Sequence, residues 1–264
     1  MPQGELNGWQ YAYADEGSGP PVVLLHGLEM DSSMFDHQVE ALRDSYRVVT
    51  IDAPGHGESA AVPVGIDFYT YGDMVAGVAD QLGIGPAVWG GQSMGGFTIL
   101  RLALRQPERF KGLILIDTQA HSEDPDKLAQ YEAFLTVSLD QGVSEDLVNI
   151  LLMILFSETY ANKPESDVWR KKLLAIDVPG AHAMIRAVFD RDDVHSRLGE
   201  IRCPAVVIHG EEDVAIELER GEELARDLPD ATFVPIPDAG HASPCEQPEP
   251  VTAAIKAFLE RIKY

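Results

Sequence analysis

The sequence contains little cysteine and little positive charge, and each shortage excludes a class of protein. Two cysteines in 264 residues, Cys203 and Cys245, cannot form a disulfide framework. The chain has only 20 basic residues but 43 acidic ones, so its formal net charge is −23. Nucleic acids and anionic membrane surfaces attract lysine and arginine, so we expect neither as a partner. The acidity itself is typical of a well-solvated surface.

Long apolar runs and metal-ligand spacings are also missing. The most apolar stretch, Leu147–Phe156, is shorter than the roughly 20 residues that a membrane-spanning helix needs. The N-terminal stretch MPQGELNGWQ has neither the basic nor the apolar region of a signal peptide. The 8 histidines are scattered without ligand spacing, so we expect no metal site and no cofactor. A cytoplasmic protein, as a monomer or weak homodimer, is the expectation that remains.

Short apolar runs recur along the chain, and Gly, Pro or Asp ends each of them: PVVLLHG, RVVTIDAPG, AVWGG, LILIDT, AVVIHG and TFVPIP. Runs this short and this rich in β-branched residues predict buried strands. Helical patterns lie between them, for example Tyr71–Gly83 and Gly96–Phe110. Strands that alternate with helices indicate an α/β fold with a mostly parallel central sheet flanked by helices.

The alternation stops once, between Thr118 and about Val194, where only helical patterns occur. We predict that residues 119–195 form a helical cap, inserted into an α/β core made of residues 1–118 and 196–264. Two separate domains are the alternative interpretation. The last strands, however, need the first ones to complete the sheet.

The stretch GQSMG, Gly91–Gly95, places Ser93 between a predicted strand and a predicted helix. Ser93 could be a nucleophile, part of a phosphate-binding loop, or only a turn residue. A phosphate-binding loop would need lysine where Phe97 stands. The pattern G-x-S-x-G is typical of a sharp turn that presents a serine hydroxyl, and the two glycines remove Cβ atoms that would collide there.

A second loop, LLHGLEMD, follows the strand at Val22–Leu25. Acyl transfer needs two backbone N–H donors for the developing oxyanion, and we predict those of Leu28 and Met94. Glu29 lies beside one donor, and an inward carboxylate would repel the negative charge. We therefore expect Glu29 to face solvent or the cap, with binding of a substrate hydroxyl as the alternative.

An acid and a base follow the last two predicted strands, Asp213 in IHGEED and His241 in DAGHASPCEQPE. In this order His241 would take the proton of Ser93 and return it to the leaving group, while Asp213 would fix the imidazole tautomer. Each residue has a structural alternative, since Asp213 could cap a helix and His241 could serve a turn. The occurrence of all three after successive strands favours the catalytic interpretation.

Across nearly its whole length the chain resembles the α/β-hydrolase superfamily, on the segments LLHG, DAPGHGES, GQSMGG, IHGEED and DAGHASPCEQPE. It looks most similar to the capped esterases, enol-lactone hydrolases and cofactor-free haloperoxidases. The resemblance implies the α/β-hydrolase fold, Ser93 as nucleophile, His241 as base and Asp213 as acid. Asp117 stands where some members keep their acid, and we favour Asp213. The proline that usually follows the acid is absent here.

We therefore predict a serine hydrolase that cleaves a small-to-medium, largely apolar carboxylic ester or lactone through an acyl-enzyme. A carbon–carbon bond hydrolase, a perhydrolase and a ligand sensor without turnover remain as alternatives. A further prediction names five residues that contact the substrate: Glu29, Gln92, Leu151, Ile154 and Leu155.

Overall fold

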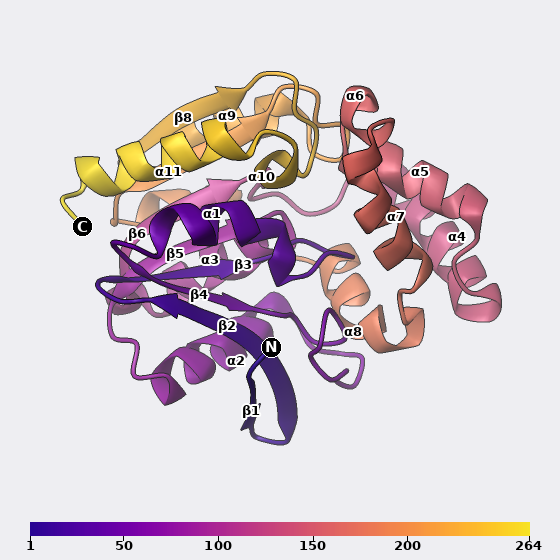
Figure 1. Cartoon of the computed structure of the whole chain (residues 1–264), viewed down its shortest axis with the longest axis horizontal. Helices are drawn as coiled ribbons and strands as arrows, with labels where there is room; N and C mark the ends of the chain where they lie inside the picture. The colour runs from indigo at the N-terminus through magenta and orange to yellow at the C-terminus, as the bar shows by residue number, and fades with distance from the viewer.

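One sheet of eight strands forms the centre of the molecule, and it is parallel except at one edge (Figure 1). The computed structural model describes residues 1–264. The strand order is β1-β2-β4-β3-β5-β6-β7-β8, in which β2 pairs antiparallel with both β1 and β4. The strands are β1 (Gln3–Leu6), β2 (Trp9–Gly17), β3 (Pro21–Leu25), β4 (Arg47–Ile51), β5 (Ala87–Gln92), β6 (Phe110–Ile116), β7 (Ala205–Gly210) and β8 (Ala231–Ile236).

Helices cover both faces of the sheet, which confirms the predicted α/β class. Along β3, Val23 and Leu25 pack into one hydrophobic cluster, while Val22 and Leu24 pack into another. Successive strand residues point to opposite faces, so a strand that is buried on both sides is apolar throughout. The first cluster includes helices α2 (Phe68–Gln81), α3 (Met94–Arg105) and α9 (Leu218–Asp227), and the second includes α1 (Asp36–Leu42) and α11 (Pro248–Arg261).

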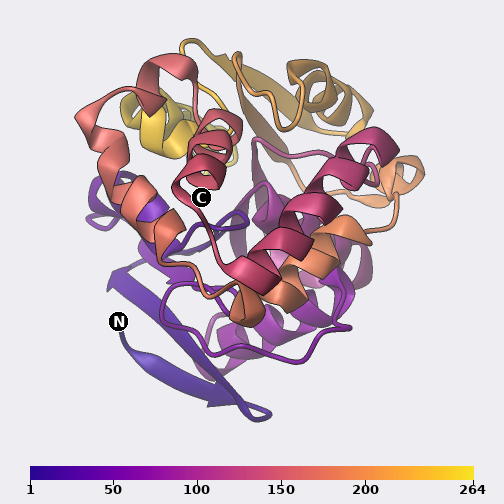
Figure 2. The same ribbon diagram turned by 90° about the vertical axis from the view of Figure 1, so that its right-hand side faces the viewer.

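Between β6 and β7 the chain contains helices and no strand. These are α4 (Pro125–Gln141), α5 (Glu145–Leu155), α6 (Glu158–Ala161), α7 (Asp167–Leu174) and α8 (Val178–Phe189), which we call the cap helices. They gather on one side of the core, beyond the ends of the parallel strands (Figures 1 and 2). The chain returns to the sheet through the 3-10 helix η4 (His195–Glu200).

Helix boundaries and one hairpin differ from the sequence predictions, and helix α2 spans Phe68–Gln81 where the pattern predicts Tyr71–Gly83. Helix α3 spans Met94–Arg105, whereas the pattern predicts Gly96–Phe110. It ends early because Pro107 cannot continue it, and Phe110 already begins β6. The antiparallel hairpin of β1 and β2 has no counterpart among the predicted strands. Three further 3-10 helices and one short helix connect these elements: η1 (Ser32–Phe35), η2 (Pro107–Arg109), η3 (Pro164–Ser166) and α10 (Ser243–Glu246).

No helix of the structure combines the length and the apolar character that crossing a membrane requires.

Candidate active site

Ser93 occupies the turn between β5 and α3 with a strained backbone, at φ 48° and ψ −110°. An L-residue rarely adopts positive φ, and such strain is common where a side chain must be presented. The chain bends so sharply that a Cβ on Gly91 would lie 2.3 Å from the backbone carbon of Gly95. Two hydrogen bonds hold the turn: the Ser93 N–H donates to the Ile116 carbonyl, and the Thr118 hydroxyl donates to the Ser93 carbonyl, each over 2.9 Å.

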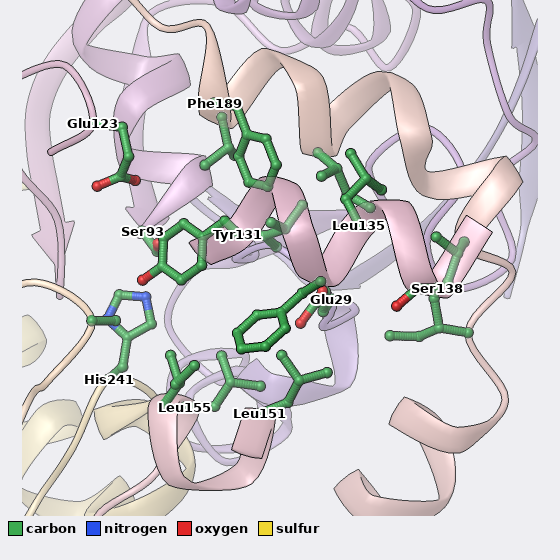
Figure 3. A pocket seen from close by; sticks show the side chains of 18 of the residues that line it. Glu29, Ser93, Glu123, Tyr131, Leu135, Ser138, Leu151, Leu155, Phe189 and His241 are labelled. Carbon is green, nitrogen blue, oxygen red and sulfur yellow. The ribbon is translucent and has the colours of Figure 1, made fainter. Parts of the chain in front are cut away.

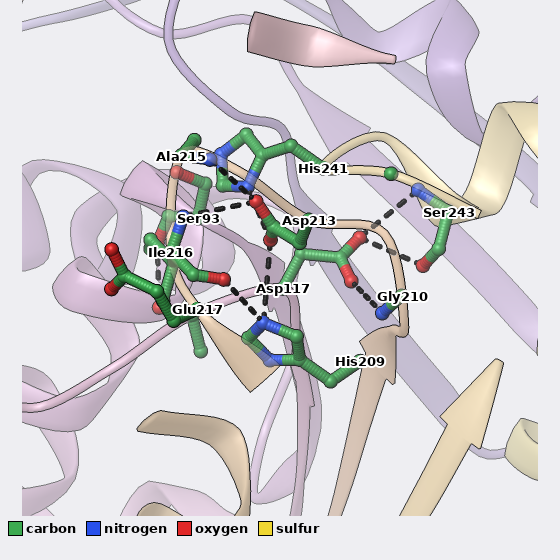
Figure 4. A network of polar contacts seen from close by, with 12 residues as sticks. Ser93, Asp117, His209, Gly210, Asp213, Ala215, Ile216, Glu217, His241 and Ser243 are labelled. Atoms are coloured by element: carbon green, nitrogen blue, oxygen red, sulfur yellow. Dashed lines mark hydrogen bonds and ion pairs between the residues drawn. The ribbon is translucent and has the colours of Figure 1, made fainter. Parts of the chain in front are cut away.

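The structure brings Asp213 and His241 together, although 27 residues separate them in the chain. Nδ1 of His241 lies 2.8 Å from Oδ2 of Asp213 (Figure 4). The other oxygen, Oδ1, accepts the backbone N–H groups of Ala215 and Ile216, both over 2.9 Å. The carboxylate is therefore held on both oxygens, and it fixes the imidazole so that Nε2 is the nitrogen left for chemistry.

A second histidine, which the sequence analysis did not single out, contacts the same carboxylate. Nε2 of His209 lies 3.3 Å from Oδ2 of Asp213 and 2.9 Å from the carbonyl oxygen of Ile216 (Figure 4). His209 is fully buried at the end of β7. The only sequence signal for it was its place in the motif IHGEED.

Burial and charge act against each other in this pair. Burial alone would raise the pKa of Asp213, but the positive charge of His241 and the hydrogen bond from His209 lower it to about 2. Burial likewise disfavours the charged form of His241, yet Asp213 outweighs it, so the pKa of His241 is raised above its ordinary value. The carboxylate thus stabilises an imidazolium at position 241.

Asp117, the alternative acid, has a different set of partners. Its Oδ2 accepts the backbone N–H and the hydroxyl of Ser243, over 3.0 and 2.7 Å, and its Oδ1 accepts the N–H of Gly210 over 2.9 Å (Figure 4). Burial raises the pKa of Asp117 to about 7. Asp117 joins the loops that follow β7 and β8, whereas the hydrogen bond to the His241 ring belongs to Asp213.

The two predicted oxyanion donors have free N–H groups. No protein acceptor is bonded to the amide of Leu28, and Met94 begins α3, where helix geometry provides no acceptor. The loop before Leu28 is organised by His26, whose Nε2 accepts the Ala53 N–H over 2.9 Å. His26 therefore has a structural role in this loop.

Ser93 and His241 border one end of a largely apolar cavity that encloses about 1010 Å³, its mouth included (Figure 3). Seventeen of its 23 lining residues are hydrophobic, and the cap helices contribute most of them. The lining includes four of the five residues predicted to contact substrate: Glu29, Leu151, Ile154 and Leu155. A cavity of this kind, with a few polar groups at fixed points, is typical of small-molecule sites.

Of the two expected orientations of Glu29, toward solvent or toward the cap, the structure has the second, since Glu29 faces the cavity that the cap helices line (Figure 3). Its backbone is also in the left-handed region, at φ 62°. Burial raises the pKa of Glu29 to about 7. A carboxyl group with this pKa is largely neutral below pH 7 and repels a nearby oxyanion less than an ionised one.

The prediction that Gln92 contacts substrate is corrected. Its side chain is fully buried and does not border the cavity, and its amide N–H donates to the backbone carbonyl of His241 over 2.5 Å. The Gln92 side chain packs directly against the backbone of Gly27. A Cβ atom at position 27 would lie 1.9 Å from Oε1 of Gln92, so only glycine fits there. Gln92 positions the loop that carries His241.

Four cavity residues with polar groups were missed by the sequence analysis: Glu123, Tyr131, Ser138 and Arg191. Arg191 and Glu123 form an ion pair over 2.8 Å, with side chains exposed by 1% and 10%. The guanidinium also lies over the ring of Phe97, at 4.4 Å from its centroid. Nothing in the local sequence signals these residues, because the pair joins the two ends of the inserted segment.

Known proteins resemble this chain over most of its length. The sequence model of the family described as the alpha/beta hydrolase fold matches residues 20–248. A pimeloyl-[acyl-carrier protein] methyl ester esterase from Nitrosomonas europaea is 28% identical, over 92% of this chain and 96% of its own. A thermophilic esterase from Thermogutta terrifontis superposes with a TM-score of 0.91 at 33% identity, over 99% of this chain and 97% of its own. The enol-lactonase from Burkholderia xenovorans LB400 superposes with a TM-score of 0.90 at 29% identity, over 98% and 100%.

Proposed function

Because the chain belongs to the α/β-hydrolase family and is a hydrolase of the ester- or lactone-cleaving kind, we propose that Ser93 is its nucleophile, with His241 as base and Asp213 as acid. The substrate is a small-to-medium, largely apolar carboxylic ester or lactone. The reaction passes through an acyl-enzyme on Ser93.

The proposed reaction needs only these residues, the two backbone donors and one water molecule. His241 Nε2 removes the hydroxyl proton as Ser93 Oγ attacks the carbonyl carbon, and the N–H groups of Leu28 and Met94 receive the oxyanion. When the tetrahedral intermediate collapses, His241 gives the proton to the leaving alkoxide. Water then loses a proton to His241, attacks the acyl-enzyme and releases the acid, and Ser93 regains its proton.

One observation carries the proposal: His241 is bonded through Nδ1 to the buried carboxylate of Asp213, and it borders the same cavity as the strained Ser93. The hydrogen bond selects the tautomer in which Nε2 is a base, and the raised pKa of His241 suits an imidazolium that forms and disappears in each cycle. The free N–H of Leu28 supports the assigned oxyanion site.

The cavity supports an apolar substrate of limited size. Its walls are mostly aliphatic and aromatic, so each methylene of an acyl or alcohol chain that enters it gains about 0.8 kcal/mol. Glu29 is a polar exception in the lining, and as a neutral acid it would donate a hydrogen bond to a carbonyl or ether oxygen of the substrate. Esterases and enol-lactonases among the similar proteins support the same bond class.

The test is steady-state hydrolysis of a chain-length series of p-nitrophenyl esters, with a lactone panel alongside. We expect Ser93→Ala to lower kcat by about 10⁴-fold or more, since removal of a triad nucleophile costs this much in serine hydrolases. Ser138→Ala is the matched control, because Ser138 is also buried and borders the cavity. It should change KM more than kcat.

Equal activity of Ser93→Ala and the unmodified enzyme would refute the assigned nucleophile. An unmodified enzyme that is inert toward every ester and lactone would refute the substrate class. A burst of one equivalent of p-nitrophenol without turnover would favour a ligand sensor instead.

A further inference from the structure

A cluster of histidines and carboxylates lies where the chain enters and leaves the cap, apart from the cavity of Ser93. His121 follows β6 on the way into the cap helices, and His195 begins η4 on the way out. His121 contacts Glu223, and His195 contacts both Glu223 and Asp227, which α9 carries. None of these four residues borders the active-site cavity.

The imidazole rings of the cluster are stacked, with centroids 4.4 Å apart and an interplanar angle of 21°. Nε2 of His121 lies 2.8 Å from Oε2 of Glu223. Nε2 of His195 lies 2.7 Å from Oδ2 of Asp227 and 3.8 Å from Oε1 of Glu223. One donor atom from each of His121, His195 and Glu223 lies within 4.8 Å of the others.

A fifth residue, Asp193, contacts both histidines away from their Nε2 atoms and orients them. Its Oδ2 lies 2.9 Å from Nδ1 of His121, and its Oδ1 accepts the backbone N–H of His195 over 2.9 Å. A carboxylate on one ring nitrogen is the arrangement that directs the other nitrogen of a histidine toward a metal ion. Asp193 therefore leaves Nε2 of His121 to face Glu223.

The charges of the cluster favour a dication. Asp193, Glu223 and Asp227 bring three negative charges, while Arg220 and Arg226, at 3.2 and 3.5 Å from Glu223, bring two positive ones. Both Nε2 atoms face carboxylate oxygens, and two stacked imidazolium ions would repel each other. One divalent ion would contact both nitrogens and a carboxylate oxygen of Glu223 at once.

We propose that His121, His195 and Glu223, with Asp227 as fourth ligand, bind one divalent transition-metal ion of the Zn²⁺ type. Two imidazoles and two carboxylates form a mixed nitrogen and oxygen set that suits such ions. Bond lengths of about 2.0–2.2 Å in a tetrahedron separate ligand atoms by about 3.3 Å. The contacts of Glu223 with His121 and His195, 2.8 and 3.8 Å long, bracket this value, and the third pair of donor atoms lies within 4.8 Å.

The ion would join three segments that are distant in the sequence: the start of the cap insertion, its end, and α9 of the core. The side chains of His121, His195 and Glu223 are exposed by 21%, 29% and 26%, so an ion can reach them from solution. Since the cluster lies outside the cavity, bound metal should stabilise the cap junction without entering the reaction. This proposal does not depend on the proposed hydrolase mechanism.

Titration of zinc chloride into the chelator-treated full chain, followed by calorimetry, tests the site. We expect one ion per chain, and a Kd at least ten-fold weaker in His121→Ala and in His195→Ala. Glu223→Gln preserves the side-chain volume and removes the anionic ligand, so it should weaken binding as well while folding is retained. His37→Ala, which removes an exposed histidine elsewhere, is the matched control and should bind like the unmodified chain.

Two further measurements separate the proposed site from binding elsewhere. Co²⁺ should give the visible absorption of a four-coordinate ion in the unmodified chain and in His37→Ala, but not in His121→Ala. Zinc should raise the Tm of the unmodified chain and leave that of the doubly substituted chain (His121→Ala with His195→Ala) unchanged. Unaltered zinc affinity in the doubly substituted chain, or a Kd above 1 mM in the unmodified chain, would overturn the proposal.

Discussion

Replacing Glu29 by Gln should make the protein more stable, and the gain should grow with pH. Burial raises the pKa of this carboxyl from 4.5 to about 7 in the folded chain. The folded chain therefore binds the Glu29 proton more tightly than the unfolded chain does, and stability falls as pH rises from about 4.5 to about 7. Glutamine has nearly the same shape and no proton to lose.

The magnitude follows from the two pKa values. Each pH unit between them corresponds to about 1.4 kcal/mol, so the full penalty above pH 7 is about 3.4 kcal/mol. At pH 5 only about 0.8 kcal/mol of it is present, because pH 5 lies only half a unit above the pKa of this carboxyl in the unfolded chain. Between pH 5 and pH 8 the advantage of Glu29→Gln should widen by about 2.5 kcal/mol. This is an upper bound, since water in the cavity can hydrate the carboxylate.

Urea unfolding at pH 5, 6, 7 and 8 measures the effect as a difference between variant and parent, in which all other titrations cancel. Glu260→Gln removes an exposed glutamate and serves as the control, with a difference below about 0.5 kcal/mol at every pH. A Glu29→Gln difference that stays constant from pH 5 to pH 8 would refute the raised pKa. It would also remove the argument that Glu29 is a neutral hydrogen-bond donor to substrate.

Two other substitutions test the assigned roles. Asp213→Asn should lower kcat by about 10³–10⁴-fold. It should also move the acidic midpoint of the kcat/KM profile to lower pH, because burial then lowers the pKa of His241 without the opposing charge of Asp213. A pH–rate profile that keeps its midpoint would contradict this. Leu151→Trp should narrow the cavity and lower the ratio of kcat/KM for p-nitrophenyl hexanoate to that for p-nitrophenyl acetate by about ten-fold or more. Met153→Trp, on the exposed side of α5, should leave this ratio unchanged.

Most of the sheet could be predicted because its strands are buried on both faces. In β3 and β5 nearly every residue is buried, so the sequence is a short apolar run that ends at a turn. The hairpin of β1 and β2 is partly exposed and lacks such runs. Its signal was the dipeptide Asn7-Gly8, whose residues have φ of 51° and 87°, as a tight hairpin turn requires.

The order of Ser93, Asp213 and His241 could be predicted because each follows a strand, and parallel strands end at one edge of the sheet. What surrounds these residues could not. Gln92 stands beside Ser93 in the sequence, but strand alternation sends its side chain to the interior, toward the carbonyl of His241.

The histidine cluster could not be predicted from the sequence either, because its residues are far apart in the chain. Local metal motifs place ligands a few residues apart, whereas His121 and His195 are separated by the whole cap insertion. Only the fold brings them to α9. The absence of ligand spacing in the sequence therefore carries no weight against a site built from long-range contacts.

The buried carboxylate of Asp213 contacts two histidines, His209 and His241. Nε2 of His209, which is hydrogen-bonded to the Ile216 carbonyl, also lies 3.3 Å from Oδ2 of Asp213, the oxygen that faces the His241 ring. The charge of His209 beside this carboxylate lowers the pKa of His241 and so works against its protonation. The pKa of His241 is thus raised less than an unshared Asp213 would raise it. A base that must release its proton in every cycle needs such a limit, because an imidazole that stays protonated at neutral pH cannot accept the proton of Ser93.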